Sequence, residues 1–323
     1  MSPTTSTVVS ELETDVAIVG LARPAQDIVE LTLARTDAAS LPGWTPGAHI
    51  DLILADDLVR QYSLCSSPSD PSAYKVAVLL EPHSRGGSKR VHELTEGATL
   101  RIRGPRNHFQ LVSAAKYIFV AGGIGITPLI PMIEEVDAAG ADWQLHFGGR
   151  TRSSMAYLAE LEQRYGSRVT AVPQDEAGIL DLATILGNPD PDTLVYCCGP
   201  EPLLDAMEAG CANWPSGALH LERFAAKTIE REGEDTEFEI VMQRSGVTAT
   251  VPPDKSVFDV IREAGVSVLG SCLEGTCGTC ETGVLEGEID HRDSVLDPDE
   301  QEAMDVMMVC VSRCNGARLV LDA

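Results

Sequence analysis

The chain has 323 residues, of which 24 are Lys or Arg and 49 are Asp or Glu, giving a net charge of −25. Phosphate backbones and anionic lipid repel so acidic a chain, which argues against nucleic-acid and membrane partners. With 44% apolar residues, no run of about 18 of them and no basic, apolar leader, the sequence predicts a globular cytoplasmic protein. Nine cysteines in such a chain indicate metal binding or catalysis rather than disulfides.

The first part of the chain, which we place at residues 1–112, consists of short strands separated by Pro and Gly. The predicted strands cover residues 15–21, 28–34, 49–54, 60–65 and 74–80. Short strands at this spacing predict a small antiparallel β-barrel or sandwich. Two of its segments have binding chemistry. One is Arg60, Tyr62 and Ser63 on a predicted strand, and the other is the turn Gly86, Gly87 and Ser88, whose backbone N–H groups suit an anion.

A second part, residues 113–226, alternates strands with helices. Predicted strands cover residues 117–121, 144–148, 168–172 and 193–198, and predicted helices cover 128–139, 155–165 and 201–209. This alternation predicts a parallel α/β sheet. The first strand runs into Gly122, Gly123 and Gly125, followed by Thr127, which we expect to cap the helix, and by Pro128 at its first position. Bare N–H groups at such a turn suit a pyrophosphate.

The third part follows a charged linker at 227–235 and covers residues 236–323. A hairpin (238–243 and 247–251) and a helix (256–264) precede the spacing Cys272-x4-Cys277-x2-Cys280, and Cys310 follows 30 residues later on a predicted apolar strand. This is the plant-type 2Fe–2S pattern, with small residues between the thiolates. The alternative, a structural zinc site, usually shows paired C-x2-C units or histidines. Cys314 is off the pattern and is taken as a non-ligand.

These segments resemble known families. Residues 60–66 match the R-x-Y-S-x-x-S motif of the ferredoxin–NADP reductase superfamily, and residues 236–323 resemble plant-type ferredoxins, which implies a β-grasp domain. The order of flavin barrel, nicotinamide domain and ferredoxin resembles the phthalate dioxygenase reductase family. The resemblance implies flavin phosphate at Arg60, ring packing at Tyr62 and the flavin N5 region at Ser63. FMN is favoured over FAD because no adenine platform is visible.

The same resemblance assigns residues to the pyridine nucleotide. It places Cys198 and Gly199 beside the nicotinamide, Arg150 and Arg152 near the adenosine ribose, and Phe224 over the flavin. The two arginines would meet a 2′-phosphate or only stack on adenine, so the choice between NADPH and NADH stays open. NADH is the expected donor. Ser63 and Cys198 are the predicted catalytic residues.

The implied function is electron transfer from NADH through FMN and a 2Fe–2S cluster, one electron at a time, to a separate Rieske oxygenase that demethylates or hydroxylates an aromatic or related substrate. Alternatives are a reductase for a haem monooxygenase, a diaphorase without a partner, or a non-enzymatic ferredoxin-like carrier. The charge is unevenly divided: −3 over residues 1–112 and −11 over each of 113–235 and 236–323. We therefore hypothesise that the acidic ferredoxin surface steers a basic oxygenase patch.

Overall fold

The computed structural model describes residues 13–55, 58–82, 86–227, 234–296 and 298–323. By its internal contacts the chain forms two compact units, one of residues 1–197 with 213–220 and the other of 198–212 with 221–323. This division falls within the predicted 113–226 domain, so the three domain boundaries stay predictions. Most of the predicted linker, residues 228–233, lies outside the described residues.

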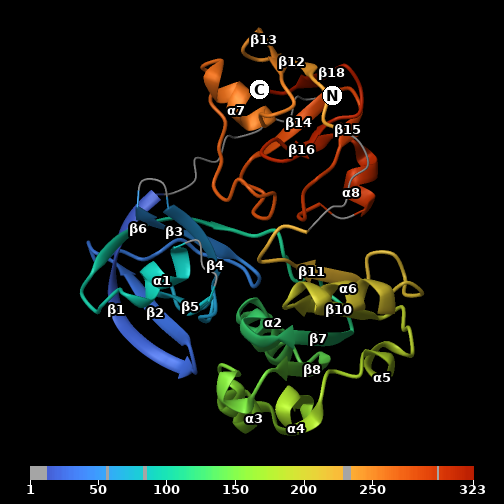
Figure 1. Ribbon diagram of the computed structural model, residues 1–323. Helices are drawn as coiled ribbons and strands as arrows, with labels where there is room; N and C mark the ends of the chain where they lie inside the picture. The colour runs from blue at the N-terminus through green and yellow to red at the C-terminus, as the bar shows by residue number, and fades with distance from the viewer. Residues whose placement is uncertain (1–12, 56–57, 83–85, 228–233, 297) are drawn as a thin grey trace. The chain divides into compact units, whose positions relative to one another are not determined.

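The first sheet is the predicted antiparallel barrel, drawn in blue and cyan in Figure 1. Its order is β4-β3-β6-β1-β2-β5. The strands are β1 (Glu13–Ala25), β2 (Ile28–Arg35), β3 (His49–Ala55), β4 (Leu58–Ser63), β5 (Tyr74–Leu79) and β6 (Thr99–Arg106), with the helix α1 (Gly87–His92) after β5. A bridge between Leu64, just after β4, and Val76 on β5 joins the two edges of the sheet. The sheet therefore closes on itself, and it includes β6, which was not among the strands named from the sequence.

Alternating apolar side chains fill the barrel. Val16, Leu31, Leu33, Ile50 and Leu52 are fully buried, at 0% exposure. Burial of each such side chain stabilises the fold by about 1.5–3 kcal/mol. The period-2 alternation that predicted strands is thus the pattern that creates the core.

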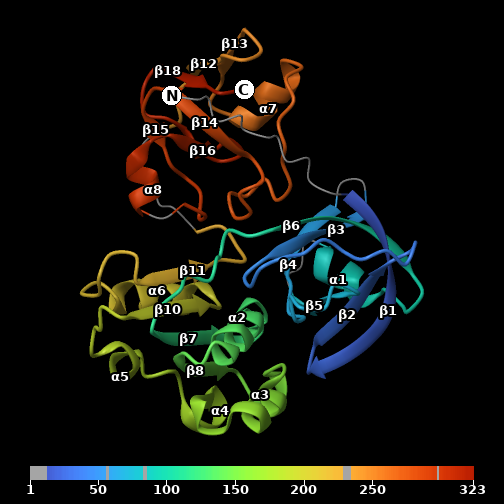
Figure 2. The same cartoon turned by 180° about the vertical axis from the view of Figure 1, so that it is seen from behind.

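The second sheet has the order β11-β10-β7-β8-β9, and the pairs β7–β8 and β8–β9 are parallel as predicted. Its strands are β7 (Lys116–Gly122), β8 (Asp142–Gly149), β9 (Val169–Pro173), β10 (Thr193–Cys198) and β11 (Leu219–Glu222). Its helices are α2 (Ile126–Ala138), α3 (Leu158–Tyr165), α4 (Gln174–Ala177), α5 (Leu182–Leu186) and α6 (Glu201–Gly210). Figure 2 shows α2 packed beside β7 and β8.

The ferredoxin part contains a mixed sheet of order β13-β12-β18-β14-β16, in which β12 and β18 are parallel and the other printed pairs antiparallel. The elements are β12 (Phe238–Met242), β13 (Val247–Val251), α7 (Val257–Glu263), β14 (Glu281–Glu286), β15 (Ile289–Asp290), α8 (Pro298–Ala303), β16 (Val306–Met308), β17 (Arg313–Cys314) and β18 (Arg318–Leu321). Ser256 caps α7 by accepting from the N–H of Asp259 at 3.0 Å. Buried Val257, Phe258 and Ile261 hold α7 on the sheet.

Three local expectations were wrong. Helix α2 begins at Ile126, before Pro128, and Thr127 does not cap it, because its Oγ1 donates to the carbonyl of Ile124 at 3.0 Å. A 3-10 turn at Gly123–Gly125 fills the predicted loop. Helix α3 begins at Leu158 rather than at residue 155, because Tyr157 adopts a left-handed conformation. Cys310 lies in a turn two residues after β16 and not on a strand.

Among the described residues, no helix is both long and apolar enough to cross a bilayer.

Candidate functional site

The two segments of the barrel with binding chemistry meet. Arg60 lies on β4, and a Cβ atom added to Gly87 would stand 2.5 Å from its Cγ and 2.9 Å from its Nε. The side chain of Arg60 therefore lies against the start of α1, where a side chain at position 87 would clash with it. Gly86, before it, has a φ of 96°, which favours glycine. A guanidinium and backbone N–H groups placed together are suited to a phosphate.

The other residues of the flavin motif lie further along β4. Ser63 is buried and pairs with His49 on β3, while Tyr62 is half-buried and pairs with Ile50. Burial raises the pKa of Tyr62 to about 12, so its phenol is neutral at physiological pH. Ser88 is also buried, and its Oγ accepts from the N–H of Glu81 at 3.1 Å. Its hydroxyl thus joins the start of α1 to Glu81.

The glycine-rich turn after β7 has unoccupied space beside its backbone at Gly123. Gly123 has a φ of 56°, and a Cβ placed on it would meet no atom within 4 Å. The conformation favours glycine, and the space above it is free. Gly122 ends β7 and Gly125 precedes α2, so the turn lies at the carboxyl end of a strand in a parallel sheet. Ligands of open α/β sheets bind at such ends.

Cys198 is the last residue of β10 and is fully buried. Its thiol donates to Oε2 of Glu222, 3.9 Å away, at the end of β11. Glu222 was not singled out from the sequence, because nothing in its spacing connects it to a cysteine 24 residues earlier. Its neighbour Arg223 is buried and forms ion pairs with Glu201 and with Glu208, the latter at 2.9 Å.

Phe224, two residues after Glu222, is 47% exposed. It is not a core residue, which was the competing interpretation of an aromatic side chain at this point. Its predicted role over the flavin stays a prediction.

The two arginines after β8 differ in their surroundings. Arg150 is exposed, and no ion pair of its side chain is found among the described residues. Arg152 pairs with Glu162 at 2.9 Å and lies 4.0 Å from Glu176. The carboxylates raise the pKa of Arg152, chiefly through the hydrogen bond to Glu162. They also compete with any anionic group of a ligand for this guanidinium.

The predicted cluster cysteines come together. The thiol of Cys272 contacts those of Cys277 and Cys310, and the thiol of Cys280 contacts that of Cys310. These contacts lower the pKa of Cys272 and raise the pKa values of Cys277 and Cys310, because the thiols donate to and accept from one another. No three His, Cys, Asp or Glu side chains of the described residues meet in the geometry of a single metal ion. The donor set is nevertheless four thiols from one loop and one turn, the set that a two-iron cluster needs.

Neighbouring groups support this loop. The N–H of Glu274 lies 3.3 Å from Sγ of Cys272, and Oγ1 of Thr279 lies 3.2 Å from Sγ of Cys277. A Cβ on Gly275, whose φ is 69°, would stand 2.6 Å from Val311. Cys314 has separate partners, namely the carbonyl of Arg318 at 3.5 Å and the N–H of Gly316 at 3.2 Å.

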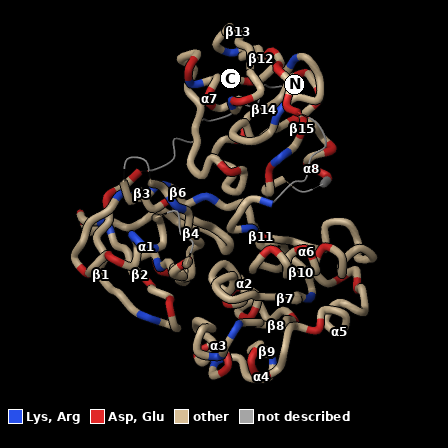
Figure 3. Tube along the Cα trace, viewed as in Figure 1, with Lys and Arg blue, Asp and Glu red and all other residues tan. Residues whose placement is uncertain are grey.

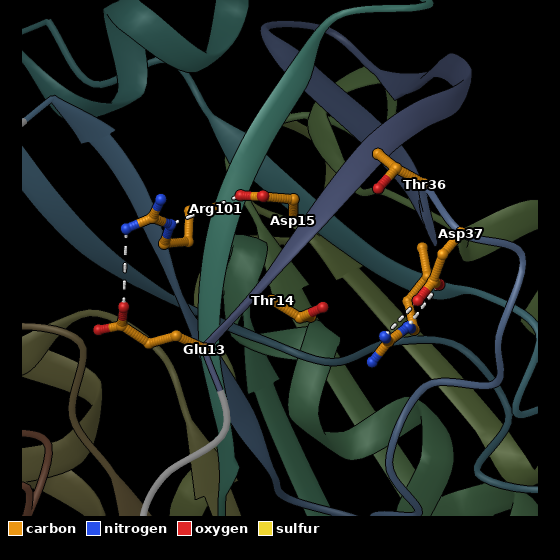
Figure 4. Close-up of a pocket in the computed structure, with 7 residues that line it drawn as sticks. Glu13, Thr14, Asp15, Thr36, Asp37 and Arg101 are labelled. Atoms are coloured by element: carbon orange, nitrogen blue, oxygen red, sulfur yellow. Dashed lines mark hydrogen bonds and ion pairs between the residues drawn. The ribbon is translucent and has the colours of Figure 1, made fainter.

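A hollow on the barrel contains none of the predicted site residues. It is lined by Glu13, Thr14, Asp15, Arg35, Thr36, Asp37 and Arg101. Figure 4 shows Arg101 directed between Glu13 and Asp15. Arg35 forms an ion pair with Asp37 at 2.6 Å. Its cations are already paired with its own acids, so we assign it no ligand.

Comparisons with known proteins agree with this arrangement. The model of the 2Fe-2S iron-sulfur cluster binding domain matches residues 240–315, and that of the oxidoreductase NAD-binding domain matches residues 119–209. The chain is 42% identical to a putative toluene-4-sulfonate monooxygenase system reductase subunit of Comamonas testosteroni, over 95% of this chain and 98% of that protein. It is 35% identical to the phthalate 4,5-dioxygenase oxygenase reductase subunit of Pseudomonas putida, over 96% of each.

Two solved structures are similar over nearly the whole chain. Phthalate dioxygenase reductase, described as a modular structure for electron transfer from pyridine nucleotides to [2Fe-2S], superimposes with a TM-score of 0.70 at 35% identity, over 97% of this chain and 98% of that one. An intact type IV self-sufficient cytochrome P450 monooxygenase superimposes with a TM-score of 0.91 at 44% identity, over 96% of this chain. The chain spans 41% of that P450 chain.

The antiparallel barrel, the NAD-binding sheet and the iron–sulfur domain define an NAD(P)H-dependent oxidoreductase of the flavin and iron–sulfur class. Within that class, the chain belongs to the phthalate dioxygenase reductase family, whose members include reductase subunits of monooxygenase and dioxygenase systems.

Proposed function

We propose that this protein is the NADH-dependent, FMN-containing reductase component of a Rieske oxygenase system. The close approach of Arg60 to Gly87 is the observation that supports the flavin part of this proposal. It brings together two segments that are each suited to bind a phosphate. When bound, a flavin accepts a hydride and releases its two electrons singly, and a 2Fe–2S cluster accepts one electron at a time.

The residues of the chain bind and orient these groups. Arg60 and the N–H groups of Gly86 and Gly87 hold the flavin phosphate, with Ser88 bracing their loop. Tyr62 stays neutral and packs on the ring, and Ser63 offers a hydroxyl from within the barrel. A terminal phosphate held in this way is the feature of FMN, which favours it over FAD.

The pyridine nucleotide is positioned by the second sheet. The turn at Gly122, Gly123 and Gly125, with Thr127 behind it, receives the pyrophosphate, and Cys198 with Gly199 lies at the nicotinamide. Arg150 is available to the adenosine ribose. Arg152 is engaged by Glu162 and Glu176, which disfavours a 2′-phosphate and supports NADH as the donor.

The four cysteines Cys272, Cys277, Cys280 and Cys310 would hold the cluster. The same part of the chain is acidic, and its acidic residues include Asp299, Glu300 and Glu302 on α8. Figure 3 shows acidic positions in red at that helix. An acidic surface attracts a basic partner patch, and salt screens such attraction. The partner proposal therefore includes a salt dependence: coupled turnover should fall as ionic strength rises.

Anaerobic titration with NADH tests the proposal. Flavin and cluster absorption bands that both bleach, with FMN identified by mass after release, are the expected result. Cluster bands without flavin would leave only a ferredoxin-like carrier. Coupled turnover is then measured with candidate Rieske oxygenases at low and high salt.

A haem monooxygenase is a second candidate for the partner. The observation that favours it is the similarity to the self-sufficient P450, at a TM-score of 0.91. The part of that P450 that matches this chain makes up 41% of its length. Turnover supported by a separate haem monooxygenase, and not by Rieske oxygenases, would favour this second candidate.

A further inference from the structure

A partly buried hydrogen bond joins the barrel to the segment before α3. The hydroxyl of Tyr157 donates to Oε2 of Glu30, on β2, at 2.7 Å. Glu30 is only 8% exposed, and its other oxygen pairs with Nζ of Lys75, on β5, at 3.1 Å. The two residues are 127 positions apart, so only the tertiary fold brings them together.

Apolar contacts surround this pair. Ile28, Cys65, Ala77 and Ala156 are buried in one cluster, against which Ala25, Leu79, Ile124 and Tyr157 pack. A backbone hydrogen bond from the N–H of Gln26 to the carbonyl of Ser153, at 2.9 Å, runs beside it. The barrel and the segment 153–157 are therefore joined by a packed and hydrogen-bonded contact.

Both ends of this contact are close in sequence to the proposed binding residues. Ile124 lies inside the glycine-rich turn proposed for the pyrophosphate. Cys65 follows Ser63 by two residues, and its Sγ lies 3.7 Å from the hydroxyl of Tyr157. Tyr157 thus contacts the continuation of the flavin strand and belongs to the same cluster as the nucleotide turn.

The backbone of Tyr157 supports a specific role for its side chain. Its φ is 62° and its ψ is 3°, a left-handed conformation that is uncommon for a residue other than glycine. Such a conformation persists where surrounding contacts hold it. Burial and the neighbouring Cys65 and Glu30 raise the pKa of Tyr157, so the hydroxyl keeps its proton and remains a donor.

We propose that Tyr157, through its hydrogen bond to Glu30, is a positioning residue. It would fix the position of the glycine-rich turn at 122–125 relative to β4, the barrel strand that ends at Ser63. This inference rests on the proposed function, since it concerns hydride transfer between nicotinamide and flavin. Loosening the contact displaces the donor from the acceptor while leaving each binding site intact. Because hydride transfer requires close alignment, a small displacement slows it strongly.

The test compares Tyr157→Phe with Tyr165→Phe in the intact holoprotein. Tyr165 stands at the end of α3 with its ring 4.9 Å from that of Trp143, and its buried hydroxyl has no hydrogen-bond partner among the described residues. Stopped-flow absorbance gives the rate of flavin reduction at saturating NADH, the Kd of NADH and the primary isotope effect with 4-deuterated NADH. Flavin and iron content and the flavin potential are measured on each variant.

We expect Tyr157→Phe to reduce flavin about 10-fold more slowly at saturating NADH, with a larger isotope effect and unchanged cofactor content, flavin potential and Kd. Tyr165→Phe should match the wild type. Glu30→Gln keeps an acceptor for Tyr157 and should retain most of the rate, whereas Glu30→Leu should behave as Tyr157→Phe does. The comparison of Glu30→Gln with Glu30→Leu also tests the role of this hydrogen bond if Tyr157→Phe fails to fold.

A wild-type rate in Tyr157→Phe, with only a lower melting temperature, would overturn the inference and leave the proposed function standing. Equal losses in Glu30→Gln and Glu30→Leu would also overturn it. Wild-type protein whose flavin NADH does not reduce would instead refute the proposed function, and the inference with it.

Discussion

The thiol of Cys198 donates to the carboxylate of Glu222, with 3.9 Å between Sγ and Oε2. Both residues end strands of the NAD-binding sheet. A thiol is a compact, polarizable group, and we propose that this one lies beside the nicotinamide.

Replacing this thiol tests its proposed place beside the nicotinamide. Cys198→Ala should slow flavin reduction at saturating NADH by about 10-fold, because the nicotinamide loses a surface that orients it. Cys197→Ala is the matched control, since Cys197 is equally buried on the same strand and carries no proposed role. Equal rates for the two variants in stopped-flow experiments would contradict the assignment of Cys198.

A methyl group at Gly87 should weaken flavin binding. A Cβ there would stand 2.5 Å from Cγ of Arg60, too close for the guanidinium to keep its place over the loop. We expect Gly87→Ala to raise the Kd of FMN by about 10-fold or more, as losing one charged phosphate contact would. Gly43→Ala, where a Cβ meets no atom within 4 Å, is the control. Fluorescence titration of flavin-free protein measures both, and unchanged FMN affinity in Gly87→Ala would argue against this phosphate site.

Serine substitutions distinguish cluster ligands from the off-pattern cysteine. Cys272→Ser should lose most of its iron and its visible cluster bands, because a hydroxyl is a far poorer ligand for iron than a thiolate. Cys314→Ser should keep both, since Cys314 bonds instead to the carbonyl of Arg318. Iron content and electron paramagnetic resonance of the reduced protein give the answer. Loss of the cluster in Cys314→Ser alone would reverse the assignment.

The carboxylates beside Arg152 should set the preference for NADH. In the double variant Glu162→Gln and Glu176→Gln, Arg152 is free to meet a 2′-phosphate, and repulsion of that phosphate is removed. We expect kcat/KM for NADPH to rise about 10-fold, with little change for NADH. Adding Arg152→Ala should abolish the gain, and Glu160→Gln, exposed on the same helix, is the control. An unchanged ratio of kcat/KM for NADPH to that for NADH would indicate that the 2′-phosphate of NADPH binds away from Arg152.

Acid should destabilise the protein partly through His146, on β8. Burial lowers the pKa of His146 below its usual 6.5. Its stabilising contribution is therefore complete above about pH 6.5 and is lost as the pH falls toward the folded-state pKa, because the unfolded chain takes up the proton first. Denaturant unfolding at pH 7.5 and 5.5 should show a smaller drop in His146→Gln than in the wild type. An equal drop would show that other groups account for the acid sensitivity.

Much of the fold could be predicted because its signals are local. The alternation along β2 and β3 and the strand–helix order from β7 to α6 appear directly as periodicity, which burial of one face imposes. The boundaries were less accurate: a 3-10 turn moves the start of α2 to Ile126, and the left-handed backbone of Tyr157 delays α3. The side chain of Tyr157 contacts Glu30 and Cys65, which are distant in sequence and leave no signal beside it.

The sequence by itself determined the chemistry: the cysteine spacing of the cluster loop, the Arg-x-Tyr-Ser strand and the glycine-rich turn, each of which lies within a few consecutive residues. Only the tertiary structure decided which of these segments meet. It placed Arg60 over Gly87, directed Cys198 to Glu222 and joined Tyr157 to Glu30. Side chains this far apart along the chain are brought together by burial of the sheets' apolar faces, and their register leaves no pattern in either segment alone.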